Sequence, residues 1–116
     1  REYRMPQIKA FSLALAAAAL IAPAASAQLA GYEIVAQETA VDATVSKQLI
    51  VNCPKDKRVT GGGWAALDET DAILEGQATT SQPAYDGTHW MVNAKNQSSF
   101  SPKWKLKVWA ICAKAD

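Results

Sequence analysis

The sequence has little of what enzymatic catalysis normally requires. Its 116 residues include one histidine, His89, and two cysteines, Cys53 and Cys112. It contains no G-x-S-x-G, H-E-x-x-H or comparable motif that pairs a nucleophile with a base. His89 would need an orienting carboxylate and a nucleophile to act as a general base, and its neighbour Asp86 lies across a predicted turn. We therefore predict a protein that is not an enzyme and has no cofactor.

Neither sign of charge predominates in the sequence. The chain has 12 Lys and Arg residues against 11 Asp and Glu residues, for a net charge of +1. Arg1, Arg4 and Lys9 all belong to the N-terminal segment, so the rest of the chain is close to neutral. Bulk attraction to nucleic acid or to an anionic membrane depends on a strongly basic surface. We therefore predict no nucleic-acid partner.

The one long apolar run is too short to span a membrane. Residues 11–21 are apolar except for a serine, and a transmembrane helix needs about 20 such residues. Ala25 and Ala27 form a small-residue pattern typical of signal peptidase cleavage. We predict that residues 1–27 are a helical signal peptide. Residues 28–116 would then be a single secreted or periplasmic domain, with no stable membrane insertion after cleavage.

The two cysteines are too few for a zinc site and suit a disulfide. A small domain is only marginally stable on its hydrophobic core, and a cysteine pair in an oxidising compartment typically forms a bond. A structural zinc site would also need His89 and a carboxylate. We predict a disulfide between Cys53 and Cys112 and no metal site. The acidic group Asp68–Asp71 could supply oxygen ligands for calcium, although it lacks EF-hand spacing and a charged hairpin turn is the expected alternative.

After the N-terminal segment, the main pattern is alternation of apolar and polar residues with period two. The alternating segments, strongest first, are residues 48–53, 103–112, 89–95, 32–36, 59–67 and 73–80. Polar turns separate these segments. The triple glycine Gly61–Gly63 falls inside one of them, and we expect it to turn a corner. The sequence predicts an all-β fold, a small antiparallel sandwich or barrel of six to seven strands closed by one disulfide.

Three motifs follow one another along the chain. Cys53-Pro54 precedes Gly61–Gly63, residues 90–96 read W-x-V-x-A-x-N, and residues 106–113 read L-x-V-x-A-I-C-A. Together they resemble a group of short secreted bacterial proteins, mostly of uncharacterised function. The resemblance covers about residues 32 to 113 and implies a compact β domain, closed by the same disulfide, of a kind found in surface and adhesin-like contexts. It implies no activity.

Trp109 is the first candidate binding residue. It lies on the opposite strand face from Trp104 and Leu106, in phase with alternating lysines. Rigid aromatic rings are common docking surfaces for sugars and proteins. The predicted ligand-binding residues are Trp109, Tyr85, Lys103, Lys105 and Lys107, with a surface glycan or cell-wall polymer as ligand. The lysines have a second interpretation, because lysines on an edge strand prevent aggregation.

A second interpretation combines several outward-facing apolar residues. Strand phase places Ile50, Met91, Trp109 and Ile111 away from the main core face. Either the first strand covers them through Tyr32 and Ile34, or they form an exposed interface. The sequence thus predicts an exported, non-catalytic binding or structural module that recognises carbohydrate. The alternative is a protein-interaction module, such as an inhibitor or adhesin-like subunit. Polar neighbours around an exposed flat aromatic would favour sugar, and a broad apolar patch would favour protein.

Overall fold

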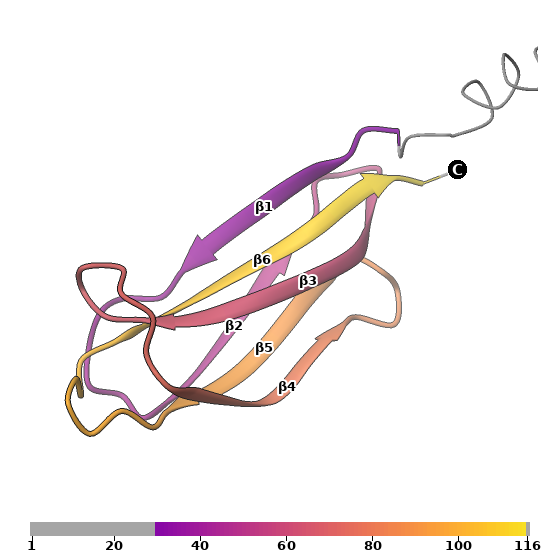
Figure 1. The fold of residues 1–116 in the computed structure, drawn as a ribbon. Helices are drawn as coiled ribbons and strands as arrows, with labels where there is room; N and C mark the ends of the chain where they lie inside the picture. The colour runs from indigo at the N-terminus through magenta and orange to yellow at the C-terminus, as the bar shows by residue number, and fades with distance from the viewer. Residues whose placement is uncertain (1–29, 116) are drawn as a thin grey trace, which may run out of the picture.

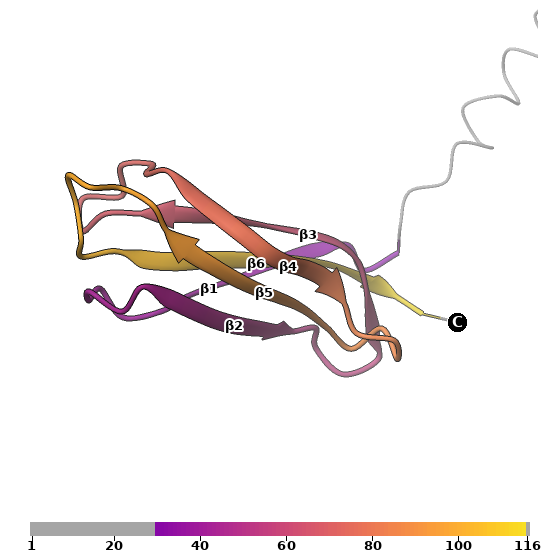
Figure 2. The same ribbon diagram turned by 90° about the horizontal axis from the view of Figure 1, so that it is seen from below.

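The computed structural model describes residues 30–115, which form a sandwich of two three-stranded antiparallel sheets (Figures 1 and 2). The strands are β1 (Glu33–Glu38), β2 (Ser46–Asn52), β3 (Lys57–Leu67), β4 (Gly76–Pro83), β5 (His89–Asn96) and β6 (Lys105–Lys114). The first sheet has the order β1-β6-β3, and the second has the order β2-β5-β4. The all-β prediction is confirmed. The predicted signal peptide, residues 1–27, lies outside the described residues.

The core lies between the two sheets and follows the predicted alternation. Leu106, Val108 and Ala110 on β6 are fully buried, as are Val51 on β2 and Val92 on β5. Each large aliphatic side chain removed from water stabilises the fold by about 1.5–3 kcal/mol. Trp104, just before β6, is also fully buried and fills one end of the core. The inward residues of each strand therefore meet those of the opposite sheet.

The predicted disulfide between Cys53 and Cys112 is present and joins the two sheets. Cys53 directly follows β2, whereas Cys112 lies inside β6. The bonded residues are 59 positions apart in the sequence, and closing a loop of this length stabilises a fold by about 4 kcal/mol on the loop-entropy model. Such a bond is typical of proteins from oxidising compartments.

The triple glycine does not turn a corner, and that expectation is wrong. The three residues lie within β3, where their faces alternate as in any strand. A Cβ atom on Gly62 would fall 2.3 Å from the indole of Trp90, and one on Gly63 would fall 2.8 Å from the indole of Trp109. The glycines therefore let one tryptophan approach the strand from each side. The register shift in β3 lies between Val59 and Gly61.

The loop between β3 and β4 is longer than the alternation predicts. Ile73 makes only an isolated bridge to Leu67, and β4 begins at Gly76. Asp68 holds this loop, because its Oδ1 atom accepts hydrogen bonds from the Thr70 amide, the Thr70 hydroxyl and the Ala72 amide. Within residues 30–115, no helix is long and apolar enough to cross a membrane.

Candidate functional site: the outer face of the β1–β6–β3 sheet

The outward side of the first sheet brings together four apolar residues, which we call the Trp109 surface: Ile34, Ala36, Trp109 and Ile111. Trp109 is at its centre, because it pairs with Ala36 on β1 and with Gly63 on β3. Ile34 lies opposite Ile111, one step further along the same face. Ile34 remains 56% exposed. The patch is therefore continuous across β1 and β6.

The indole of Trp109 lies against the backbone of β3. A Cβ atom built on Gly63 would be 2.8 Å from Nε1, 2.9 Å from Cε2 and 3.0 Å from Cζ2 of the ring. These three atoms are consecutive along one side of the indole, so this side of the ring covers Gly63. Trp109 is accordingly only partly buried. Its outward position confirms the phase that the alternation predicts.

The first strand does not cover Trp109, which excludes the first of the two alternatives given for the outward-facing residues. β1 pairs beside β6 in the same sheet, so Ile34 extends the face sideways. Tyr32, just before β1, is 54% exposed. The interpretation of the lysines as edge protection is also wrong, because β6 is the central strand of its sheet.

The three predicted lysines differ in their surroundings. Lys105 forms ion pairs with Glu38 at 3.1 Å and with Asp71 at 2.6 Å. Hydrogen bonds to these carboxylates, that to Asp71 first, raise the pKa of Lys105 above its usual value. Lys107 lies next to Trp109 on the same strand face, pairs with Ala65 of β3 and has no ion pair among the described residues. Lys103 precedes β6 and is exposed. Only Lys103 and Lys107 are therefore available to a ligand.

The structure does not place Tyr85 on the Trp109 surface. Tyr85 is fully exposed in the turn between β4 and β5, which belong to the second sheet. That turn meets the beginning of β3, where the Val59 amide donates to the Gly87 carbonyl at 2.8 Å. Trp109 pairs further along β3, at Gly63. The predicted ligand-binding residues are therefore divided between two parts of the molecule.

The predicted apolar cluster of four residues is corrected in the same way. Ile50 and Met91 pair with each other on β2 and β5, with their side chains on the outward side of the second sheet. Trp109 and Ile111 point outward from the first sheet. Because the two outward sides of a sandwich face in opposite directions, the four residues cannot contact one partner surface together. Of these four predicted residues, only Trp109 and Ile111 belong to the Trp109 surface.

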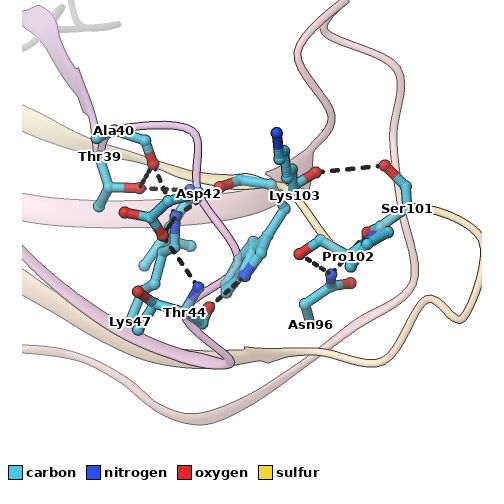
Figure 3. Close-up of polar contacts among 11 residues, drawn as sticks. Thr39, Ala40, Asp42, Thr44, Lys47, Asn96, Ser101, Pro102 and Lys103 are labelled. Atoms are coloured by element: carbon cyan, nitrogen blue, oxygen red, sulfur yellow. Dashed lines mark hydrogen bonds and ion pairs between the residues drawn. The ribbon is translucent and has the colours of Figure 1, made fainter.

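A buried polar cluster around Lys47 was not predicted (Figure 3). The Nζ atom of Lys47 donates to the carbonyl oxygen of Ala40 at 2.7 Å and to that of Trp104, and it forms an ion pair with Asp42 at 2.9 Å. It also lies 5.0 Å from the centre of the Trp104 ring. The Trp104 indole in turn donates to the Thr44 carbonyl at 2.6 Å.

The Lys47 cluster serves the structure, because its polar atoms are already paired. It ties the β1–β2 connection across the end of the core. The sequence contained one signal for it: Lys47 is in phase with Leu49 and Val51, the inward residues of β2. The pKa of the Asp42 carboxyl is lowered below its usual value, chiefly by the hydrogen bond from Lys47 and then by hydrogen bonds from Thr44.

The acidic group Asp68–Asp71 does not belong to a metal-binding cluster among residues 30–115. In this part of the chain, no group of three or more His, Cys, Asp and Glu residues could hold a metal ion. Asp68 uses a carboxylate oxygen within its own loop, and the hydrogen bond from the Thr70 hydroxyl is the main reason why its pKa is lowered. Compared with known proteins, the chain matches no family model, no curated protein and no solved structure.

Proposed function

We propose that this chain is an exported, non-catalytic binding module that docks a partner protein on the Trp109 surface. The observation that carries the proposal is the position of Trp109, whose ring rests on Gly63 among Ala36 and Ile111. Aromatic residues at the centre of an apolar patch commonly dominate the energy of protein interfaces. The disulfide supports export, since such bonds persist in oxidising compartments.

The chemistry around Trp109 favours protein over carbohydrate. A sugar-binding site needs polar groups beside the aromatic ring, because each sugar hydroxyl that loses water needs a hydrogen-bond partner. The neighbours of Trp109 across the sheet are Ala36 and Gly63, and its neighbours on its own strand face are Lys107 and Ile111. Lys105 is already paired with two carboxylates. Among residues 30–115, Lys107 is the one charge on this part of the face that forms no ion pair.

The test compares Trp109→Ala with Phe100→Ala, which removes a fully exposed aromatic from the β5–β6 turn. The purified protein is added to its native secretome, and the proteins that cross-link to it are identified. The affinity of each variant for these partners is then measured with purified components. We expect Trp109→Ala to weaken the affinity for a protein partner by about 5- to 150-fold, which corresponds to about 1–3 kcal/mol. Phe100→Ala should leave the affinity unchanged.

A second variant changes the surface without removing the aromatic ring. Gly63→Ala places a methyl group where the indole of Trp109 now lies, so the ring must lift and the affinity should fall as well. A glycan array is screened in parallel. Glycan binding that depends on Trp109, or a protein partner that binds Trp109→Ala as tightly as the original chain, would overturn the proposal.

A further inference from the structure

The four edge strands of the sandwich differ in how they avoid pairing with another chain. Natural edge strands are commonly protected by inward-pointing charges, bulges, prolines or covering segments. β2 carries the inward lysine Lys47, and β4 has a register shift between Ala78 and Thr80 and ends at Pro83. β3 also has a register shift, and its free edge is covered where the Leu74 amide donates to the Ala66 carbonyl at 2.9 Å.

β1 has fewer of these protections, since its one inward-facing charge, Glu33, lies at the very beginning of the strand. Its sequence, Glu-Ile-Val-Ala-Gln-Glu, contains no lysine, arginine or proline, and its register with β6 is unbroken. Its two acidic residues are engaged by ion pairs within the domain, Glu33 with Lys57 and Glu38 with Lys105. The centre of the strand is therefore an uncharged edge that no described residue covers.

The backbone groups on this edge can be assigned from the ladder with β6. The Thr39 amide donates to the Leu106 carbonyl at 2.9 Å, and antiparallel strands alternate between residues that bond to the neighbour and residues that face away. The backbone groups of Val35 and Gln37 therefore hydrogen-bond to β6, whereas the amide and carbonyl groups of Ile34 and Ala36 point away from it. Figure 1 shows β1 at the open side of its sheet.

We propose that β1 pairs with the β1 strand of a second copy of this chain, antiparallel and with the two-fold axis at Val35. In this register Ile34 of one copy lies opposite Ala36 of the other, and their free amide and carbonyl groups hydrogen-bond in both directions. Glu33 lies opposite Gln37, so no like charges meet. An edge that is self-complementary about a two-fold axis suits a second copy better than an unrelated strand.

The pairing would join two first sheets into one continuous sheet. The Trp109 surfaces of the two copies would then lie on the same side, with Ile34 and Ala36 at the junction. Because the contact is one short strand with its flanking side chains, it is at the small end of specific interfaces. We expect a reversible dimer that depends on concentration. The proposal stands independently of the function proposed for Trp109.

The experiment combines sedimentation equilibrium at micromolar to millimolar concentrations with amide hydrogen exchange. The original chain should associate, and the Ile34 and Ala36 amides should exchange more slowly as the dimer fraction rises. The Ile50 amide should not change with concentration. It is the internal control, because its backbone groups lie on the free edge of β2. This follows from the hydrogen bond that the Cys53 amide donates to the Thr88 carbonyl across the β2–β5 ladder, since residues that bond to the neighbour alternate with residues that face away.

Two variants address the edge directly. Ala36→Pro removes a free amide without breaking the bonds to β6, and Ile34→Lys adds a charge at an exposed position; each should weaken association by about tenfold or more. Ile73→Lys is the matched control, since Ile73 is an exposed isoleucine in the β3–β4 loop, and it should dimerise normally. A chain that stays monomeric at every concentration, or a dimer that tolerates Ile34→Lys, would overturn the proposal. If Ala36→Pro does not fold, the Ile34→Lys variant alone tests the edge.

Discussion

Gly62 and Trp90 contact each other across the interior of the sandwich, the glycine from β3 and the tryptophan from β5. A Cβ atom on Gly62 would fall 2.3 Å from Cδ2 and 2.4 Å from Cγ of the indole. No heavy atom fits at such a distance, so the two sheets can approach this closely only because the residue is glycine.

This contact predicts a severe effect of adding one methyl group. Gly62→Ala must displace the Trp90 ring within the core, and we expect the free energy of unfolding to fall by about 3 kcal/mol, as overpacked cores do. Gly61→Ala is the control, because its Cβ would meet only Ile111 Cδ1 at 3.5 Å, an ordinary contact. Urea unfolding followed by fluorescence measures both. Equal stability of the two variants would contradict the packing described.

The disulfide predicts a large effect of removing both cysteines together. Replacing Cys53 and Cys112 by alanine frees a loop of 59 residues in the unfolded chain, and stability should fall by about 4 kcal/mol. The measurement is chemical denaturation of the original and doubly substituted chains. Reductant should lower the stability of the original chain and leave the substituted chain unaffected. Reactive thiols in the native protein without denaturant would show that the bond is not formed.

The buried Lys47 cluster predicts a stability cost for losing the ammonium group. Lys47→Met keeps most of the side-chain volume but removes the hydrogen bonds from Nζ to the Ala40 and Trp104 carbonyls and the ion pair with Asp42. We expect a loss of about 2 kcal/mol, the typical contribution of hydrogen bonds from a charged donor. Lys95→Met removes an exposed lysine from β5 and should be nearly neutral. A neutral Lys47→Met would mean that the cluster adds nothing to stability.

Three aspartates predict a loss of stability in acid. The pKa values of Asp42, Asp68 and Asp86 are lowered, chiefly by hydrogen bonds from Lys47, Thr70 and Thr88 respectively. A carboxyl group with a lower pKa in the folded state stabilises the fold at a pH above its unfolded pKa of about 3.9. That contribution disappears as the pH falls through the lower folded value. We therefore expect the free energy of unfolding to fall below about pH 4.

Asp68→Asn should weaken this acid dependence. Glu69→Gln is the control, because it removes a charge from the same loop but none of the hydrogen bonds around Asp68. Unfolding midpoints measured between neutral pH and about pH 3 would compare the variants. An acid profile that is the same in Asp68→Asn as in the original chain would show that Asp68 is not one of the responsible groups.

Strand alternation predicted much of this fold because it reports local geometry. It correctly placed Leu106 and Val108 inside and Trp109 outside, since side chains of a strand point alternately to its two faces. It could not show which strands lie side by side. β6 pairs with β1, the first strand of the described residues, and this neighbour depends on contacts between distant segments. Ile50 and Trp109 were therefore assigned to one surface although they belong to different sheets.

The candidate site was only partly predictable for the same reason. Trp109 could be found from its phase alone, but its neighbours Ala36 and Gly63 come from two other strands. The ion pairs of Lys105 depend on Glu38 and on the loop that contains Asp71. Nothing in the pattern around Lys105 indicates that either carboxylate is near.

The position of the disulfide also determines how the sandwich would respond to tension. The described chain begins and ends at the same end of the fold, where the Lys114 amide donates to the Ala30 carbonyl at 2.7 Å. A pull on these two ends would peel β1 from β6 one hydrogen bond at a time. Because Cys112 is bonded to Cys53, force would pass through the covalent bond and bypass residues 54–111. The domain could lengthen only by releasing residues 30–52 and the last residues after Cys112, so it would act as a tether with a fixed maximum extension.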